Sequence, residues 1–166
     1  MKKWLALFMF AAIALTFCAC SGNTGEPVTI IESDPNLQIA NPFVDYETPE
    51  LAAKAVGFEL KVPETVAGYS ERIIQIANGK LYQVMYLNGD DRLIIRKEQG
   101  FKDISGDYNK YPEITDETIA SREVNLKGAE GKISCAVWAD GDYTFAVTCD
   151  TPMDADAMRA LIRSVE

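Results

Sequence analysis

Short turn signals between runs of alternating apolar and polar residues constrain the fold of this chain more than any other feature of its sequence. Asn78-Gly79, Asn88-Gly89 and Asp140-Gly141 each separate two such runs. Asparagine, aspartate and glycine readily adopt the positive backbone angles of a tight hairpin, so each pair predicts two neighbouring antiparallel strands. The chain is therefore expected to build its core around an antiparallel sheet.

The alternating pattern predicts a sheet of six to seven strands. The candidate strands lie at residues 58–62, 69–77, 80–87, 92–98, 118–126, 132–138 and 143–149. The long segment 101–115 is rich in aspartate, glycine and asparagine and also contains Phe101, Tyr108 and Tyr111. We expect this segment to be a loop that its aromatic side chains pack down onto the domain.

Two helices complete the prediction. For the first helix, Thr48 can cap the amino end, Pro49 suits the first turn and Gly57 suits the stop. Its predicted core-facing residues are Leu51, Ala55 and Val56. The second helix begins after a capping Thr151 or Asp154, and its apolar residues recur at helical spacing. Those residues are Met158, Leu161, Ile162 and Val165. Strands and helices together predict an α+β domain with both helices packed on the sheet.

The turns also predict which side chains share a face of the sheet. Counting outward from them places Ile73, Val84 and Ile95 in one row on the core face. The opposite face mixes polar side chains with apolar ones that a ligand could meet. The apolar candidates are Ile74, Leu81, Met85 and Ile94. Three interpretations of this face are open: partial cover by the amino-terminal tether or by the loop after Gly100, one wall of an apolar groove, or a dimer contact.

Cys135 and Cys149 lie in the last predicted hairpin, and export to an oxidising compartment would favour a disulfide between them. The predicted register pairs Trp138 with Tyr143 and Cys135 with Ala146. Side chains alternate between the faces of a sheet, so this register puts the two cysteines on opposite faces, where they do not bridge. We therefore expect two free buried thiols; a bulge would change the parity and permit a bridge.

The first twenty residues have the pattern of an export signal that ends at a cysteine. Lys2 and Lys3 precede an uncharged apolar run, Trp4 to Leu15, and the small Ala19 precedes Cys20. This segment resembles a bacterial lipoprotein signal peptide, in which the cysteine beside the cleavage site receives a diacylglyceryl group. The resemblance implies a protein that is exported and then anchored by lipid.

Cys20 is the preferred lipidation site because Cys18 follows a bulky phenylalanine where a small residue is needed. A secreted, unlipidated chain and an uncleaved anchor are the alternatives, although the apolar run is shorter than the roughly twenty residues of a membrane span. The predicted domains are a signal peptide at 1–19, a lipidated cysteine and flexible tether at 20–40, and one α+β domain at 41–166. The protein would be held on the outer face of the bacterial cell membrane.

The charge of the mature chain argues against one class of partner. The formal net charge is −9, and it becomes −11 when removal of the signal peptide takes Lys2 and Lys3 away. Nucleic-acid binding relies on clustered lysine and arginine residues. We therefore expect no nucleic-acid partner.

The functional groups of the common catalytic sites are missing from this sequence. The chain has no histidine, which removes Ser-His and Cys-His pairs and most catalytic zinc sites. It also lacks a Cys-x-x-Cys motif and a phosphate-binding glycine loop. We predict no catalytic residue, no cofactor and no metal ligand. Turn aspartates such as Asp90, Asp103 and Asp140 leave structural calcium as an alternative, since calcium prefers oxygen ligands.

Short motifs spread over residues 41–165 together carry a resemblance to a protein family. They are Asn41-Pro42-Phe43-Val44, Val62-Pro63-Glu64, Gly68-Tyr69, Asn88-Gly89-Asp90-Asp91, Ile94-Ile95-Arg96-Lys97, Ile104–Asn109, Trp138–Tyr143 and the final helix. The pattern resembles an uncharacterised domain family of lipoproteins from Gram-positive gut bacteria, and also the extracytoplasmic domains of some anti-sigma membrane proteins. The resemblance implies a curved antiparallel sheet with helices packed on it, outside the membrane, and it implies no functional residues.

These observations predict a membrane-anchored extracytoplasmic lipoprotein that is a non-enzymatic binding or sensing module of the cell envelope. Its partners would be the membrane, through the lipid anchor, and another envelope protein or a small apolar ligand. One alternative is a carrier of a small hydrophobic ligand, which a deep apolar cavity would favour. The second alternative is a carboxylate-based hydrolase, which two carboxylates converging in a cleft would favour.

Overall fold

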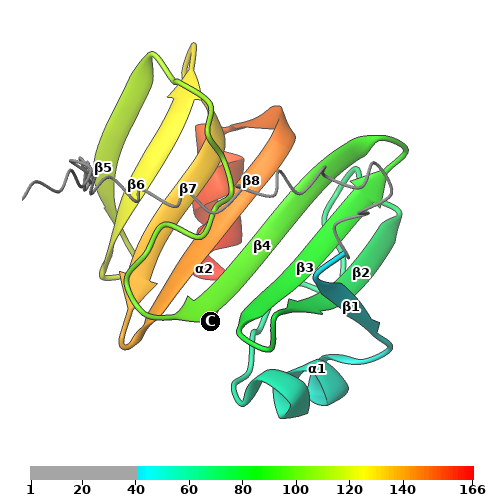
Figure 1. Cartoon of the computed structure of the whole chain (residues 1–166). Helices are drawn as coiled ribbons and strands as arrows, with labels where there is room; N and C mark the ends of the chain where they lie inside the picture. The colour runs from blue at the N-terminus through cyan, green and yellow to red at the C-terminus, as the bar shows by residue number, and fades with distance from the viewer. Residues whose placement is uncertain (1–40) are drawn as a thin grey trace, which may run out of the picture. The chain divides into compact units, whose positions relative to one another are not determined.

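A computed structural model describes residues 41–166, which form an α+β domain with an eight-stranded antiparallel sheet and two helices (Figure 1). The predicted fold class is confirmed, whereas the predicted six to seven strands are too few. The signal peptide, Cys20 and the tether lie outside the described residues. Within residues 41–166, no helix is long and apolar enough to cross a membrane.

The elements are β1 (Phe43–Tyr46), α1 (Pro49–Val56), β2 (Glu71–Ala77), β3 (Leu81–Asn88), β4 (Asp91–Gln99), β5 (Glu113–Ile119), β6 (Arg122–Ala129), β7 (Lys132–Asp140), β8 (Tyr143–Asp154) and α2 (Ala155–Arg163).

All eight strands belong to one sheet with the order β1-β2-β3-β4-β8-β7-β6-β5. This order contains two meanders, β1 to β4 and β5 to β8, in which consecutive strands are hydrogen-bonded neighbours (Figure 1). The meanders join where β4 pairs antiparallel with β8, from Leu93 opposite Cys149 to Gln99 opposite Tyr143. Because β5 lies at the far edge of the sheet, the chain between β4 and β5 has to cross one face.

The strand count differs from the prediction mainly because of one hairpin. The predicted single strand 118–126 is a hairpin of β5 and β6 that turns at Ala120 and Ser121. Both turn residues have positive φ angles, 51° and 67°. Neither residue is glycine, asparagine or aspartate, so the sequence carries no turn signal at this point. The edge strand β1 also lies in a segment without an alternating pattern, and it pairs along β2.

Residues 58–62 are not a strand of the sheet, contrary to the prediction. Lys61 instead exchanges backbone hydrogen bonds with the chain end: its N–H donates to the Glu166 carbonyl at 2.8 Å, and the Glu166 N–H donates back at 3.0 Å. The Lys97 ammonium also donates to the Glu59 carbonyl at 2.6 Å. Residues 57–64, called the strap below, therefore run over the sheet rather than within it.

One hairpin register is as predicted and its neighbour is not. Val84 of β3 lies opposite Ile95 of β4, as predicted. On the other side, Val84 lies opposite Ile74 rather than Ile73, so the predicted β2–β3 register is wrong. The β2–β3 loop contains the three residues 78–80 instead of two. One extra loop residue reverses the face of every side chain in β2, and Ile74 therefore enters the core.

The β7–β8 hairpin is tighter than predicted, but its faces are as predicted. Its loop contains only two residues, so Trp138 lies opposite Phe145 instead of Tyr143, and the predicted partner of Cys135 moves by the same amount. A shift of two residues keeps each side chain on its face. Cys135 and Cys149 are buried, free and on opposite faces, and only Cys149 belongs to the core cluster. The prediction of two free buried thiols is confirmed.

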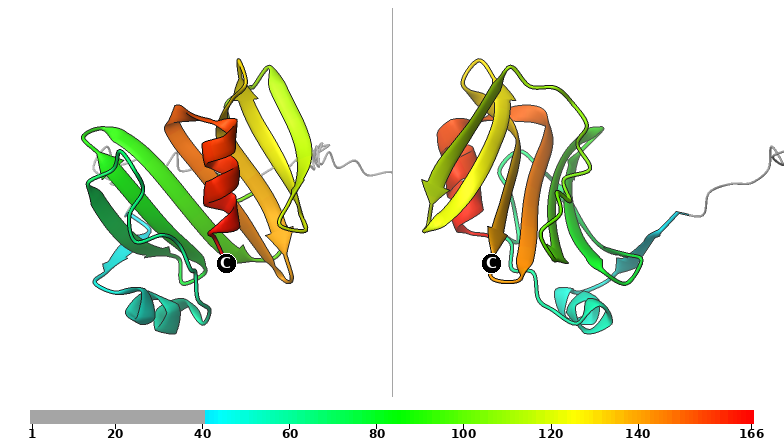
Figure 2. Two further views of the ribbon diagram at one scale, coloured as in Figure 1. Left: turned by 180° about the vertical axis from the view of Figure 1, so that it is seen from behind. Right: turned by 60° about the vertical axis from the view of Figure 1, so that its left-hand side comes forward.

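One face of the sheet carries the hydrophobic core, which α1, the strap and α2 cover (Figure 2). The four core residues predicted for the second helix are all buried: Met158, Leu161 and Ile162 lie in α2, and Val165 lies just beyond its end. Of the three residues predicted to face the core from α1, Val56 does pack against it, whereas Leu51 is 49% exposed and Ala55 also faces solvent; Ala52 is buried in their place. An eight-residue helix has little apolar surface to set its own rotation, so packing on β2 and β3 sets it.

The opposite face is partly covered by the segment between β4 and β5, residues 100–112, called the crossing loop below (Figure 1). Arg96 of β4 holds this loop, because its Nη1 donates to the carbonyl oxygens of Ile104 at 3.1 Å and Ser105 at 2.5 Å. The Arg96 Nε donates to the Gln83 Oε1 at 2.7 Å, and Gln83 is buried. The cover therefore comes from the loop after Gly100, which was one of the three interpretations.

The aromatic side chains of the crossing loop do not pack it down as predicted. Phe101 is 75% exposed and Tyr108 is 95% exposed. Of the three aromatics, Tyr111 is partly buried, and its hydroxyl donates to the Asp107 carboxylate at 2.6 Å. Hydrogen bonds to charged groups fasten this loop, and they leave no regular apolar pattern in the sequence.

Candidate functional site

The four residues predicted to face a ligand do not share one surface. Ile74 is buried in the core, because the β2–β3 register reverses its predicted face. Leu81, Met85 and Ile94 lie on the opposite face and are partly buried. None of the four lines the cavity described in the next paragraph. The proposed apolar wall therefore loses one member, Ile74.

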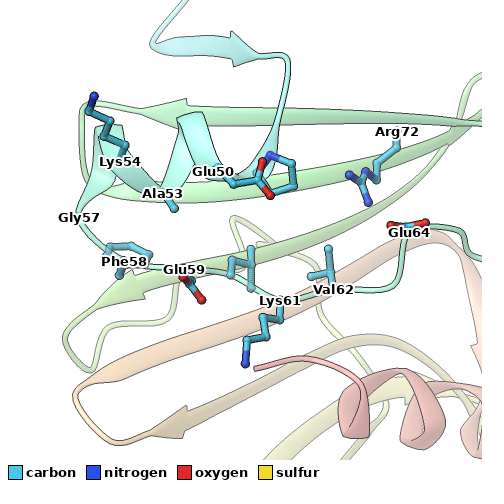
Figure 3. A pocket seen from close by; sticks show the side chains of 12 residues that line it. Glu50, Ala53, Lys54, Gly57, Phe58, Glu59, Lys61, Val62, Glu64 and Arg72 are labelled. Atoms are coloured by element: carbon cyan, nitrogen blue, oxygen red, sulfur yellow. The ribbon is translucent and has the colours of Figure 1, made fainter.

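A different concave site lies between α1 and the strap (Figure 3). This site, called the α1 cleft below, has a volume of about 710 Å³. Its size is within the range of small-molecule sites, which is roughly 300–1,000 Å³. The lining residues come from α1, the strap and β2; they are Pro49, Glu50, Ala53, Lys54, Gly57, Phe58, Glu59, Leu60, Lys61, Val62, Glu64 and Arg72.

The upper wall of the α1 cleft forms because local signals start and stop α1 at defined residues. The Thr48 hydroxyl accepts from the Leu51 N–H at 3.3 Å and caps the amino end, as predicted. Gly57 ends the helix with a φ of 90°, and its N–H donates to the Ala53 carbonyl at 2.8 Å. The left-handed conformation at Gly57 reverses the chain, so the strap runs back beneath the helix and forms the lower wall.

Two tyrosines of β3 hold the walls of the α1 cleft to the sheet. The Tyr82 hydroxyl donates to the Pro49 carbonyl at 3.2 Å, and Pro49 begins α1. The Tyr86 hydroxyl donates to the Pro63 carbonyl in the strap. Both rings are buried, and they point to the same side of the strand because they are four residues apart. The separation of the walls therefore depends on β3 as well as on α1.

Apolar and aromatic groups line the end of the α1 cleft near Gly57. Phe58 packs on Tyr143, with ring centroids 5.0 Å apart, and on Tyr82 at 6.5 Å. Ala53 is partly buried beside the core at this end, and so is Val62, which lies farther along the strap toward Glu64 (Figure 3). An apolar group that entered this end would lose contact with water on several sides, which favours its binding.

The other end of the α1 cleft carries charges. Arg72 lies on the core-facing side of β2, opposite Tyr86, and is partly buried. Figure 3 shows its guanidinium between the carboxylates of Glu50 on α1 and Glu64 on the strap. Within residues 41–166, Arg72 forms no ion pair at 4.0 Å or less, whereas Lys61 is paired with the Glu166 carboxylate at 3.0 Å.

The protonation states in this site suit hydrogen bonding better than proton transfer. Its own backbone N–H and the Thr48 hydroxyl lower the pKa of the Glu50 carboxyl, which is therefore ionised at neutral pH. Burial raises the pKa of Tyr86 to about 12, although the nearby Arg72 opposes the shift, and burial also raises the pKa of Tyr82. Both hydroxyls therefore remain neutral donors to the carbonyls of the two walls.

Among the aspartates in turns, Asp103 and Asp107 are engaged in contacts with the protein. Asp103 accepts from the Ser105 N–H at 2.9 Å and from the Lys127 ammonium at 3.0 Å. Asp107 accepts from the Asn109 N–H at 2.9 Å, as aspartates in turns commonly do. Among residues 41–166, no group of three or more acidic, histidine or cysteine side chains is placed to hold a metal ion.

Sequence reasoning missed Arg72 because it missed the β2–β3 register. With the observed register, Arg72 alternates with Ile74 and Ile76, so a charged residue occupies a core-facing position of a strand. A charge at such a position is unusual unless it is paired or reaches a water-filled site. The alternation of Arg72 with Ile74 and Ile76 was the available signal. The prediction assigned these residues to the wrong face because it assumed a loop of two residues where the structure has three.

The sequence matches no protein-family model, no curated protein and no solved structure at a significant level.

Proposed function

We propose that the mature protein is a lipid-anchored, non-catalytic binding module on the outer face of a bacterial cell membrane, and that its ligand binds in the α1 cleft. The observation that carries this proposal is the α1 cleft, a concave site of about 710 Å³ with an apolar end and a charged end. Sites for small ligands commonly combine apolar walls with a few polar groups that set orientation. The anchor follows from the sequence pattern around Cys20.

The packing of the domain favours this proposal over a carrier that encloses a hydrophobic ligand. Such a carrier needs a deep apolar cavity, and the natural place for one is between the sheet and α2. That space is filled by Met158, Ile162 and Val165, each with no exposed surface. The ligand therefore has more room in the open α1 cleft than in the core.

The Glu50 carboxylate of the α1 cleft favours binding over hydrolysis. A carboxylate-based hydrolase needs one acid that holds its proton near neutral pH. Glu50, Glu59 and Glu64 line the cleft, but the pKa of Glu50 is lowered rather than raised. An ionised Glu50 can accept hydrogen bonds from a ligand but has no proton to donate.

The anchor can be tested with two matched cysteine variants. Cys20→Ala should move the protein from the membrane fraction to the soluble fraction, because the thiol that carries the lipid is gone. Cys18→Ala is the control and should leave the protein with the membranes. Release by Cys18→Ala alone would move the lipid to Cys18, and retention of both variants would refute the lipid anchor.

The ligand site can be tested by NMR on the unlipidated mature chain, residues 21–166, which contains the whole sheet and core. Pools of amino acids, nucleotides, sugars and fatty acids would be added in turn, and the amide signals of Phe58 and Val62 followed. We expect at least one pool to shift them. Ala53→Trp should abolish the shifts by filling the α1 cleft, whereas Leu51→Trp, on the exposed side of the same helix, should preserve them. If no pool moves these signals, or Ala53→Trp leaves them responsive, the α1 cleft is not the site.

A further inference from the structure

The starting observation is a cation in the α1 cleft, Arg72, that has the Tyr86 hydroxyl beside it but no anionic partner. The Arg72 guanidinium projects from the core-facing side of β2, where its neighbours along the strand are Ile74 and Ile76. No carboxylate oxygen of residues 41–166 lies within 4.0 Å of it. A partly buried guanidinium has lost some of its hydration, and it gains most from a planar anion that accepts two hydrogen bonds.

Two anions stand near this cation without pairing with it. Glu50 and Glu64 lie on either side of Arg72 in Figure 3, one on each wall of the α1 cleft. Both carboxylates are on exposed residues and form no ion pair within residues 41–166. The charged end of the cleft therefore offers one site for a negative group and, beside it, sites for a positive group.

This arrangement discriminates between classes of ligand. An anion alone would meet Arg72 but also the repulsion of Glu50 and Glu64, in a chain that already has a net charge of −9. A cation alone would meet repulsion from Arg72. An uncharged apolar molecule would remove water from these charges without replacing it. A molecule with both charges side by side can pair with Arg72 and with one of the two carboxylates.

The geometry points to a zwitterionic ligand with an apolar side chain, an amino acid or a short peptide, and this inference rests on the proposed function. The ligand carboxylate binds Arg72, its ammonium group binds Glu50 or Glu64, and its side chain lies along the strap against Val62 and Phe58. The free amino acid and the peptide share this chemistry, and they differ in the distance between the two charges.

Four related compounds test the inference on the mature chain by NMR titration of the Phe58 and Val62 amide signals. L-phenylalanine carries both charges, 3-phenylpropionate only the carboxylate and 2-phenylethylamine only the ammonium group. L-alanyl-L-phenylalanine separates the two charges. We expect L-phenylalanine or the dipeptide to bind at least about tenfold more tightly than either singly charged compound. Each singly charged compound lacks one of the two charges that would form hydrogen bonds in the cleft. The tighter of the two zwitterions identifies the source of the ligand.

Variants of Arg72 provide the second readout. Arg72→Gln should weaken L-phenylalanine about tenfold and should strengthen 2-phenylethylamine, because the repulsion of the ammonium group is removed. If Arg72 had only a structural role, Arg72→Gln would not shift the preference from L-phenylalanine toward 2-phenylethylamine. Arg92→Gln is the matched control, since Arg92 pairs with Asp150 and lies on the opposite face of the sheet. If Arg72→Gln does not fold, Arg72→Lys keeps the charge without the planar fork and should bind L-phenylalanine with intermediate strength.

The outcomes separate this inference from the proposed function. Equal binding of 3-phenylpropionate and L-phenylalanine would overturn the zwitterion while leaving the α1 cleft as a binding site. The zwitterion is also overturned, and the α1 cleft kept as a binding site, if none of the four compounds shifts the Phe58 and Val62 amide signals but a pool of sugars, nucleotides or fatty acids does. If no compound and no pool shifts them, both the inference and the proposed ligand site fall.

Discussion

Replacing Gly106 by alanine should destabilise the domain through Arg96, and the coupling between the two residues can be measured. Gly106 lies in the crossing loop with a φ of 66°, in the left-handed region. A Cβ atom built on it would lie 2.3 Å from the Arg96 Nη1. The same Nη1 donates to the carbonyl oxygens of Ile104 and Ser105, so the guanidinium has to abandon these bonds to make room.

The loss of unfolding free energy caused by Gly106→Ala has two parts that can be measured separately. Holding alanine in the left-handed region costs about 1–2 kcal/mol. Displacing a partly buried guanidinium from its hydrogen bonds costs a further ~1.5–3 kcal/mol. Gly106→Ala should therefore lower the free energy of unfolding by about 2.5–5 kcal/mol in the native background. In an Arg96→Ala background there is no guanidinium to displace, and the same change should cost only about 1–2 kcal/mol.

The assay is a double-mutant cycle. Urea unfolding of the four chains, followed by circular dichroism, gives the free energies of unfolding and the coupling between Gly106 and Arg96. Gly106→Asn is a useful control, because asparagine tolerates the left-handed region but still carries a Cβ atom. Equal costs of Gly106→Ala in both backgrounds would refute the reasoning, since the clash with Arg96 would then contribute nothing.

Two further perturbations test the core and the acid sensitivity of the domain. Val84→Asp should abolish the folded state, because Val84 is 2% exposed in the core row and the carboxylate would have no partner there. A cooperative thermal transition near that of the native protein would contradict the β3–β4 register. The hydrogen bond from Arg159 lowers the pKa of Glu117, so its contribution to stability is present above the unfolded value near pH 4 and is lost as pH falls through the folded pKa. The melting temperature of Glu117→Gln should consequently lie below that of the native protein at pH 7 and approach it at pH 3, and a gap that is constant with pH would argue against this ion pair.

Features set by neighbouring residues were predictable from the sequence. The boundaries of α1 follow from Thr48 and Gly57, which cap its ends through hydrogen bonds within one turn. The buried face of α2 follows from the spacing of its apolar residues. The β3–β4 register follows from the short loop at Asn88-Gly89. The opposite facing of Cys135 and Cys149 survived an error of two residues because side chains alternate with a period of two.

Features that depend on a single loop residue were not predictable. The Asn78-Gly79 pair predicts a two-residue loop, but the observed loop has three residues and moves Ile74 into the core and Arg72 into the α1 cleft. The Ala120-Ser121 turn has no residue that favours a positive φ, so the tertiary pairing of β5 with β6 imposes that conformation. Local propensity is too weak to specify the backbone at either turn.

The sequence by itself determined the class of fold, the ends of α1 and the pattern typical of an exported lipoprotein, because each depends on residues close together in the chain. The α1 cleft was decided by the tertiary structure. Its walls are held by Tyr82 on Pro49 and by Tyr86 on Pro63, contacts that span 33 and 23 residues. Its cation reaches the site through the pairing of β2 with β3. Contacts over such distances arise only after the sheet has formed, and no local pattern encodes them.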